Sequence, residues 1–440
     1  MATETGAPPY TPVPELDPAE IARWRAGGGE LVELLTLARE QVGGLAAVRL
    51  GGAKPTVLVT EPRAVQHVLA QHPDRYVKRS HRARLLIGDG VLSATGDAWK
   101  SQRRLLQSQF TGQGMRRYEQ RIAEAARATA ARWAGHARTG QELDLATEMR
   151  HFALDTIWRS LTGFELDATT EAELELVGAV VAALPQLPDD SVKAHEAVAA
   201  FLERIDAIAH RAIDTARTQP PGPDGPGLLQ VLLEASAERP EYTDKLIRDE
   251  LVTLLLAGHE TTATTLTWLY LLLDRHPEAR EQALSAGPAG SPERREAVQA
   301  LVHETLRLYP SAWILPRWTA EADTVAGFAV EADTDLLVCP YLTHRDPVRW
   351  PEPERFDPTR FTRPGGRPTE HGAYLPFGLG PRACLGMQFA LRESVALLEV
   401  LLPAYTVAFR STPPRAAYSI TVRPDGPTPA VVTAAADFGG

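Results

Sequence analysis

A largely apolar stretch of 23 residues, Leu251–Leu273, is the feature that most restricts the fold of this 440-residue chain. As a helix, a stretch of this length would cross a bilayer. His259 and Glu260 stand near its middle, however, and a carboxylate at the centre of a bilayer costs about 2.5–3.5 kcal/mol even on lenient insertion scales. The stretch therefore predicts a long helix buried in a protein core, with polar groups placed there for a reason.

The composition is that of a folded globular protein, with 44% apolar and 23% charged residues. A net charge of −10 argues against non-specific nucleic-acid binding. The N-terminus has neither the basic start nor the apolar core of a signal peptide, so we expect a soluble cytoplasmic protein with no membrane contact. The only cysteines, Cys339 and Cys384, are too few for a disulfide framework or a four-cysteine zinc site.

The spacing of apolar residues predicts a mainly α-helical fold with a minor β part. Helical spacing dominates residues 61–275, with further helices at about 294–309 and 385–402. Short β segments are expected at 46–50 and 56–59, and hairpins at 404–434. No clear boundary interrupts the chain. We therefore expect one domain over residues 1–440, in which residues 1–14 form a flexible N-terminal segment.

The residues around Cys384 have a composition that suits a ligand site. They read Phe377-Gly378-Leu379-Gly380-Pro381-Arg382-Ala383-Cys384-Leu385-Gly386. The simpler interpretation is a glycine-rich turn with a buried cysteine. The glycines, however, allow the backbone to approach a flat ligand closely, and the N-terminus of the following helix would stabilise a thiolate. An anionic sulfur, an arginine for a carboxylate and an apolar wall from Phe377 together suit a haem.

These ten residues match the pattern Phe-x-x-Gly-x-Arg-x-Cys-x-Gly, and the chain thereby resembles the cytochrome P450 superfamily over roughly residues 50–430. The resemblance implies a P450-like single fold, with a helix-rich part and a small β-rich part. It also implies a haem b whose iron is bound by the Cys384 thiolate, with Arg382 on a propionate. The other haem contacts expected from this segment are Phe377, Gly378 and Gly386.

Two further segments resemble structural and haem-contacting motifs of the same family. Glu304 and Arg307 lie three residues apart on one face of a predicted helix. With Arg355, in Pro353-Glu354-Arg355-Phe356, the resemblance makes them the buried structural triad behind the haem. Trp99 and Arg103 share a helical face, and the resemblance places both of them, together with Arg317, on the haem propionates.

The centre of the long apolar helix, Ala257-Gly258-His259-Glu260-Thr261-Thr262, resembles the oxygen-binding motif of the family. The alternative is a polar patch packed against another helix, with threonines bonded to carbonyls one turn earlier. In the functional interpretation Ala257 and Gly258 contact the haem and leave room for a diatomic ligand. Thr261 hydrogen-bonds dioxygen or water, and Glu260 relays protons as a general acid. We expect Glu260 and Thr261 to be the catalytic residues.

The resemblance implies a monooxygenase that inserts one atom of dioxygen into an apolar small molecule, by hydroxylation, epoxidation or a related oxidation, in bacterial specialised metabolism. It places the substrate near Thr253, Ala257, Ala312, Trp313 and Ile420, with residues 80–95 and 183–192. A peroxide-driven haem enzyme and a non-catalytic haem sensor or carrier remain as alternatives. Neither alternative would need the acid–alcohol pair of Glu260 and Thr261.

The expected electron source is NAD(P)H, acting through a separate ferredoxin or flavodoxin-type protein, because the chain stops after the haem part. Residues 75–121 carry eleven Arg or Lys against three acidic residues, a local charge of +8. Such a patch would steer an acidic partner. The candidate contacts are Lys100, Arg104, Arg116 and Arg117. We expect the protein to be a monomer.

Overall fold

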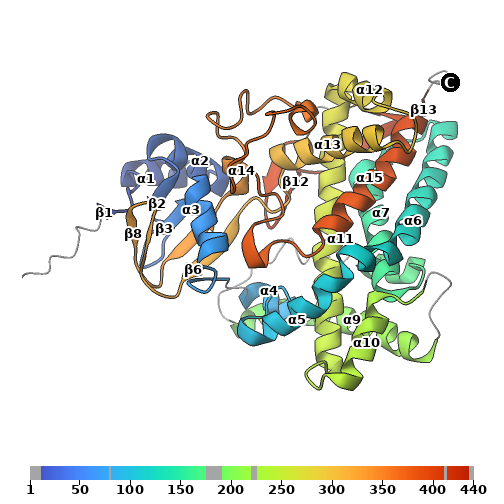
Figure 1. The fold of residues 1–440 in the computed structure, drawn as a ribbon, viewed down its shortest axis with the longest axis horizontal. Helices are drawn as coiled ribbons and strands as arrows, with labels where there is room; N and C mark the ends of the chain where they lie inside the picture. The colour runs from blue at the N-terminus through green and yellow to red at the C-terminus, as the bar shows by residue number, and fades with distance from the viewer. Residues whose placement is uncertain (1–10, 79–80, 175–190, 220–224, 411–413, 436–440) are drawn as a thin grey trace, which may run out of the picture. The chain divides into compact units, whose positions relative to one another are not determined.

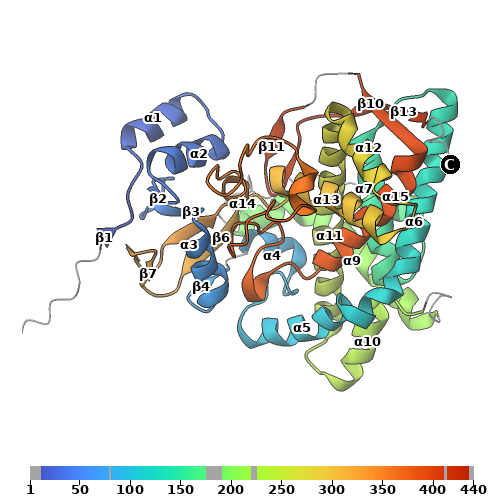
Figure 2. The same cartoon turned by 45° about the horizontal axis from the view of Figure 1, so that its top comes forward.

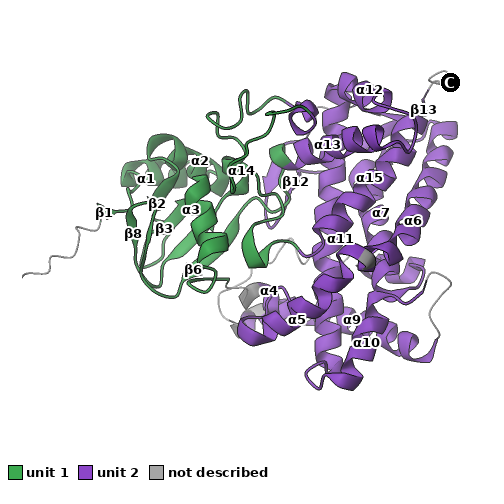
Figure 3. Cartoon of the chain, viewed as in Figure 1, with its two compact units in different colours: residues 1–79, 307–355, 363–384 green, residues 80–306, 356–362, 385–440 purple. Residues whose placement is uncertain are grey.

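The computed structural model describes residues 11–78, 81–174, 191–219, 225–410 and 414–435 (Figure 1). The chain forms two compact units, coloured separately in Figure 3. The β-rich unit comprises residues 1–79, 307–355 and 363–384, and the helical unit comprises residues 80–306, 356–362 and 385–440. The predicted fold class, mainly α with minor β, is confirmed.

The β-rich unit is built on a five-stranded sheet in the order β2-β3-β9-β6-β4. Only the β3–β9 pair is parallel. The strands are β2 (Leu45–Val48), β3 (Thr56–Val59), β4 (Tyr76–Val77), β6 (Leu315–Thr319) and β9 (Asp335–Val338). A smaller sheet has the order β1-β8-β7, from β1 (Thr11–Pro12), β7 (Asp323–Val325) and β8 (Phe328–Val330). The helices are α1 (Pro18–Ala26), α2 (Leu31–Gln41), α3 (Pro62–Gln66), η1 (His67–Gln71), α14 (Pro340–Thr343) and η4 (Gly380–Arg382).

The helical unit packs long helices around a core of leucine, isoleucine and aromatic side chains. The helices are α4 (His81–Ile87), α5 (Gly96–Gln109), α6 (Gly112–Thr139), α7 (Leu145–Thr162), α9 (Ser191–Thr218), α10 (Leu228–Glu238), α11 (Asp244–Arg275), α12 (Pro277–Ser285), α13 (Pro292–Leu308, whose last two residues belong to the β-rich unit), η3 (Pro358–Phe361) and α15 (Met387–Ala404). The strands are β5 (Leu143–Asp144), β10 (Tyr405–Phe409), β11 (Ala416–Tyr418), β12 (Val422–Pro424) and β13 (Pro429–Ala434).

The predicted long helix is α11, which lies beside α7 and α15 in Figures 1 and 2 and packs against both. It begins at an N-cap, Thr243, whose hydroxyl accepts the backbone N–H of Leu246. Nearly every residue from Ile247 to Leu273 is buried. The prediction of a helix buried in a protein core is therefore confirmed. In the part of the chain that the structure describes, no helix is long and apolar enough to cross a membrane; the cytoplasmic location stays a prediction.

The N-terminal segment departs from the prediction at its inner end. Residues 1–10 lie outside the described part of the chain. Thr11 and Pro12, expected within a flexible segment, instead pair in parallel with Phe328 and Ala329 of β8. Regular structure therefore begins before residue 14, because the free edge of β8 supplies backbone hydrogen-bonding partners for the chain.

The buried carboxylate of Glu304 identifies a different triad arginine from the predicted one. Glu304 Oε1 lies 3.4 Å from Arg360 Nε and accepts the backbone N–H of Asp357 at 2.9 Å. Both side chains of the Glu304–Arg360 pair are almost fully buried. The Arg355 side chain is 65% exposed and pairs with Glu352. The assignment of Arg355 to the buried network was therefore wrong, and Arg360 takes that place.

Arg307 holds the segment that precedes this pair. Its guanidinium donates to the carbonyls of His344 at 3.1 Å, Pro353 at 2.6 Å and Arg355 at 3.0 Å. It also lies 5.2 Å from the centre of the Trp350 ring. Arg355 thus contributes its backbone carbonyl to this cluster, while its exposed side chain pairs with Glu352. Buried carbonyls without a donor are costly, so Arg307 stabilises a stretch that has little regular structure of its own.

Replacing Arg360 by Ala should lower the free energy of unfolding by about 3–5 kcal/mol, because the buried Glu304 charge loses its partner. Arg355→Ala is the matched control, and its effect should stay within about 0.5 kcal/mol because the side chain is exposed. Urea denaturation followed by tryptophan fluorescence measures both variants. A larger loss in Arg355→Ala than in Arg360→Ala would restore the original assignment.

Candidate active site

The accessible part of α11 coincides with the predicted oxygen-binding motif. Between Ile247 and Leu273, only four residues are not buried. These are Ala257, Gly258, Glu260 and Thr261. Because the rest of this long segment is packed in the core, these residues are where a ligand can reach the helix.

Gly258 serves the packing of two helices. A Cβ atom at this position would lie 3.0 Å from Cγ1 of Ile157 on α7, which is closer than ordinary packing allows. The missing side chain therefore faces α7, and it allows the two helices to approach closely. The expectation that Gly258 leaves room for a ligand is wrong for its side-chain position. Ala257 is exposed, and its place beside a ligand stays a prediction.

Glu260 and Thr261 lie in the accessible part of α11, and their role in proton transfer stays a prediction. The Thr261 hydroxyl donates to the Ala257 carbonyl at 3.0 Å, one turn earlier in the helix. Among the described residues, no side chain or backbone group binds the partly exposed Glu260 carboxylate. His259 is turned into the core, where its Nδ1 lies 2.9 Å from the Leu255 carbonyl and burial lowers its pKa. A neutral, buried His259 has a structural role.

The loop that carries Cys384 is fixed by glycines. Gly378 and Gly380 both have φ of 72°, a conformation that favours glycine. A Cβ atom on Gly380 would lie 2.1 Å from the carbonyl oxygen of Leu69 on η1, so no other residue fits there. The backbone N–H of Cys384 donates to the Phe377 carbonyl at 2.7 Å. These contacts close the turn and leave Cys384 exposed.

The two cysteines have opposite environments. Cys339 is fully buried, and burial raises the pKa of its thiol to about 12. A thiol in this setting does not become a metal-binding thiolate at neutral pH. Cys384 is exposed in the glycine turn. The helix that follows, α15, begins at Met387 with Gly386 as N-cap, two residues later than predicted.

Three cations gather in the β-rich unit near this turn. The pKa of Arg317 is lowered to about 10 by burial and by the positive charge of Arg382. Burial, followed by the charges of Arg317 and Arg382, lowers the pKa of Lys78 to about 7. Like charges that repel one another in a partly buried place favour an anionic ligand. Arg317 and Arg382 were predicted to face propionates, whereas Lys78 was missed.

The register of β4 and β6 explains why Lys78 belongs to this cluster. β4 and β6 are antiparallel, and Val77 pairs with Trp318. Lys78, which follows Val77, therefore lies opposite Arg317, which precedes Trp318. A strand pairing between segments this far apart in the sequence is the signal that would have identified Lys78. The other expected propionate contacts, Trp99 and Arg103, lie four residues apart on α5 in the helical unit, both partly buried.

The predicted substrate residues are divided between the two units. Thr253, which is buried, and Ile420, which is 44% exposed, belong to the helical unit. Ala312 and the buried Trp313 belong to the β-rich unit. Residues 183–190 lie outside the described part of the chain. The substrate pocket therefore stays a prediction.

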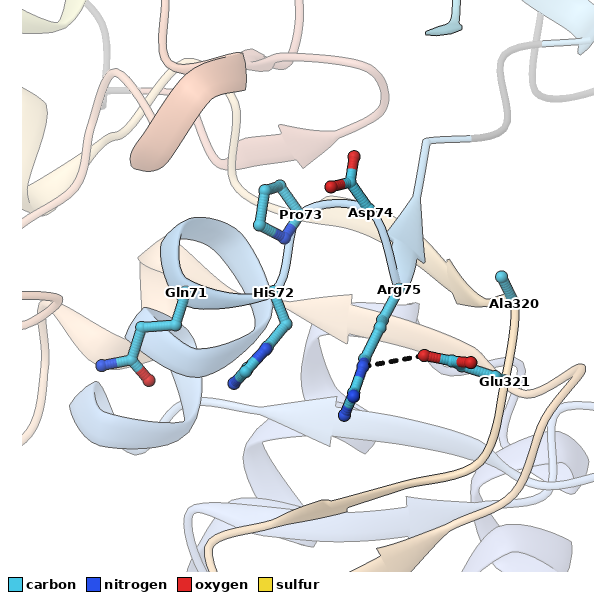
Figure 4. Close-up of a pocket in the computed structure, with 7 residues that line it drawn as sticks. All are labelled: Gln71, His72, Pro73, Asp74, Arg75, Ala320 and Glu321. Atoms are coloured by element: carbon cyan, nitrogen blue, oxygen red, sulfur yellow. Dashed lines mark ion pairs between the residues drawn. The ribbon is translucent and has the colours of Figure 1, made fainter.

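A cavity of about 390 Å³ in the β-rich unit is separate from all these residues (Figure 4). Arg75 Nε and Glu321 Oε1 form an ion pair of 2.8 Å at its wall. Its lining consists of Gln71, His72, Pro73, Asp74, Arg75, Ala320 and Glu321. No predicted site residue is among them, so this cavity is not the candidate active site.

Comparisons with known proteins show similarity over most of the chain. The family model described as Cytochrome P450 matches residues 20–427. Cyclooctatin synthase from Streptomyces melanosporofaciens is 31% identical over 82% of this chain and 82% of its own length. Cyclooctat-9-en-7-ol 5-monooxygenase from the same organism is 30% identical, over 82% of this chain and 81% of its own length.

Solved structures share the fold. CYP175A1 from Thermus thermophilus is 29% identical with a TM-score of 0.74, covering 96% of this chain and 100% of its own. The haem domain of cytochrome P450DA has a TM-score of 0.84 at 23% identity, covering 97% of this chain and 98% of its own, and this likeness shows the fold alone. Because the family model matches residues 20–427, nearly the whole chain, the chain belongs to the cytochrome P450 family.

Proposed function

We propose that Cys384 is the axial thiolate of a haem and that the chain uses this haem to oxidise an apolar small molecule. The family binds haem iron through a cysteine thiolate, and the chain is an oxygen-incorporating oxidoreductase of this family. The observation that carries the assignment is the contrast between the two cysteines. Cys384 is exposed in a rigid glycine turn, whereas Cys339 is sealed in the core with a raised thiol pKa.

The residues on the β-rich unit suit the carboxylates of a haem. Lys78, Arg317 and Arg382 repel one another, so an anionic partner would relieve that repulsion. Trp99 and Arg103 on α5 are proposed to bind the carboxylates from the helical unit. When bound, a thiolate-ligated haem iron supplies the activation of dioxygen and the electron density that favours cleavage of its O–O bond.

The proton pathway is assigned to Glu260 and Thr261. The Glu260 carboxylate is partly exposed and can exchange protons with water. The Thr261 hydroxyl, one residue further along α11, donates to the Ala257 carbonyl, and we expect it to exchange this bond for one to a ligand that reaches the helix. The pair supports the monooxygenase function over a peroxide-driven enzyme or a haem carrier, because neither alternative needs positioned proton delivery.

The substrate is proposed to be an apolar, unsaturated molecule of specialised metabolism. Cyclooctat-9-en-7-ol 5-monooxygenase acts, as its name states, on an unsaturated alcohol. Carotene epsilon-monooxygenase from Arabidopsis thaliana, 27% identical over 81% of this chain, is named for carotene. Both names describe carbon skeletons with few polar groups. The exposed apolar side chains of Leu92 and Ile420 in the helical unit suit such a molecule.

A separate acidic protein is proposed to deliver electrons to the basic surface of α5 and α6. Arg104 and Arg116 are exposed, and Lys100 is exposed although it pairs with Asp97. Arg117 is a weaker candidate, since its Nη1 is buried without a hydrogen-bond partner in the described part of the chain. Exposed cations attract a ferredoxin-type partner over a screening length of about 8–10 Å at ordinary salt.

Thr261→Ala should retain haem but release hydrogen peroxide in place of product. Removal of one positioned proton-transfer group typically slows the step by about 10²–10⁴-fold, so electrons from NADPH are diverted. The measurement is peroxide formed per NADPH oxidised, with a ferredoxin system and β-ionone as the probe alkene. Thr265→Ala is the matched control, because that hydroxyl also bonds one turn back, at 2.9 Å, but is buried. Equal coupling in wild type and Thr261→Ala would contradict the proton pathway.

Haem binding by the haem-free protein should take up protons through Lys78. With a pKa near 7, Lys78 is mostly neutral at pH 8, and nearby carboxylates would return its pKa toward the ordinary range. We expect uptake approaching about one proton per haem at pH 8. Calorimetric titration in two buffers of different ionisation enthalpy measures it. Lys78→Met should abolish the uptake and the exposed-lysine control Lys100→Met should not; an unchanged value in Lys78→Met would exclude Lys78.

A further inference from the structure

The loop at residues 88–94, between α4 and α5, is held on α11 by two neighbouring acidic residues. Asp249 Oδ2 accepts the backbone N–H of Asp89 at 2.9 Å. Glu250 Oε2 accepts the backbone N–H of Val91 at 3.0 Å. Both acidic side chains are buried. Because α11 accepts two backbone N–H groups of the loop, it fixes the position of the loop backbone.

Two glycines bring this loop unusually close to the helix. A Cβ atom on Gly88, whose φ is 53°, would lie 2.2 Å from Oδ2 of Asp249. One on Gly90 would lie 2.1 Å from Oγ1 of Thr253. The loop backbone therefore rests directly on α11 between Asp249 and Thr253, and side chains at these positions would push it away.

The two acids differ in how their charge is balanced. Asp249 has two cationic partners, Lys245 at 2.7 Å and Arg248 at 2.9 Å. Among the described residues Glu250 has none, and its second oxygen, Oε1, is buried without a hydrogen-bond partner. The charge of Asp249 is thus balanced by two cations, whereas Oε1 of Glu250 has neither a cation nor a hydrogen-bond donor among the described residues.

Two other buried polar atoms, one beside the loop and one near Glu250, also lack a hydrogen-bond partner among the described residues. The hydroxyl of Tyr242 and Oε1 of Gln102 are buried with no partner in the described part of the chain. Gln102 reaches the loop through its Nε2, which donates to the Asp89 carbonyl at 3.0 Å. Burial is the largest cause that raises the pKa of Tyr242, and the charge of Glu250 is the second. The Tyr242 and Glu250 side chains are therefore close enough to interact electrostatically. Unpartnered buried groups of this kind are commonly bridged by ordered water.

Burial, with the nearby charge of Asp249, raises the pKa of Glu250 to about 8. The buried carboxyl group therefore holds its proton more tightly than a solvated one, so the anchored loop is most stable below about pH 4.5 and loses this contribution as the pH rises from there to about 8. The other charged groups here are already paired. Lys245 and Arg84 bind Asp89, and Lys245 and Arg248 bind Asp249.

The loop lies next to the accessible part of α11. Thr253, where the loop contact ends, stands four residues before Ala257 and so one turn from it on the same face. The residue after the anchored Val91 is Leu92, whose side chain is 38% exposed. An exposed leucine in this loop would be able to contact an apolar ligand that reaches the helix.

We propose that Glu250 is a positioning residue, which holds loop 88–94, and Leu92 with it, at the border of the substrate region and so sets how well bulky apolar molecules bind. This role rests on the proposed haem-dependent function of α11. The group does not touch the reacting atoms; it acts through the backbone of Val91. Its loss should affect the binding of large ligands and leave haem binding and small iron ligands unchanged.

Hydrogen exchange and azole binding on the haem-loaded protein test this role. In Glu250→Leu, the peptide covering 88–94 should exchange about tenfold faster, because the Val91 N–H loses its acceptor. Affinity for 4-phenylimidazole, read from the haem spectrum, should fall about fivefold while that for imidazole changes less than about twofold. Glu250→Gln, which keeps an acceptor, should restore both at pH 7. It should also abolish the acceleration of exchange, beyond the intrinsic rate, that wild type shows between pH 5 and 8.

Two controls separate the anchor from other effects. Leu92→Ala should weaken 4-phenylimidazole binding without changing exchange in the loop. Glu393→Leu removes another buried carboxyl group, on α15, and should leave loop exchange unchanged. Unchanged exchange in Glu250→Leu, or equal acceleration in Glu393→Leu, would overturn the proposal. If wild type lacked a thiolate-ligated haem spectrum, the proposed function would fail, while the exchange measurements would still decide whether Glu250 anchors the loop.

Discussion

The burial of α11 is the constraint on which the helical unit depends. From Ile247 to Leu273 the helix is packed in the core except at four consecutive or near-consecutive residues. The surrounding helices must therefore cover the rest of its surface, and Gly258 allows α7 to approach closely. Polar side chains in such a buried helix lower stability unless each has a hydrogen-bond partner or contact with solvent. Thr262 donates to the buried Glu393, His259 bonds to its own helix, and Glu260 and Thr261 lie where solvent and ligands can reach.

The β-rich unit holds one exposed thiol in a rigid turn and several cations near it. Close packing of Gly380 on η1 leaves the loop little freedom. Arg317 on β6 and Lys78 beside β4 are brought opposite each other by strand pairing. Burial and repulsion from neighbouring cations lower the pKa of both side chains, and an anion nearby would offset that repulsion, so the arrangement fits a cofactor that carries carboxylates.

Features that are local in sequence could be predicted from it. The long helix was evident from one apolar run, and the turn at Cys384 from the spacing of glycines around an arginine and a cysteine. Features that depend on pairing between distant segments could not. Lys78 required the β4–β6 register, and Glu250 required the contact of α11 with the loop before α5. Arg360 was missed because residues 353–356 and 358–361 both read Pro-x-Arg-Phe, and only the fold distinguishes the buried arginine from the exposed one.

The carbon monoxide spectrum of the reduced protein tests the central claim most directly, because the Soret band reports the iron ligand. Wild type and Cys339→Ala should both show the band of a thiolate-ligated haem, since Cys339 is buried with a raised thiol pKa. Cys384→Ala should lose that band, because the exposed thiol of the glycine turn is gone. Retention of the band in Cys384→Ala, or its loss in Cys339→Ala, would contradict the assignment of Cys384 as the haem ligand.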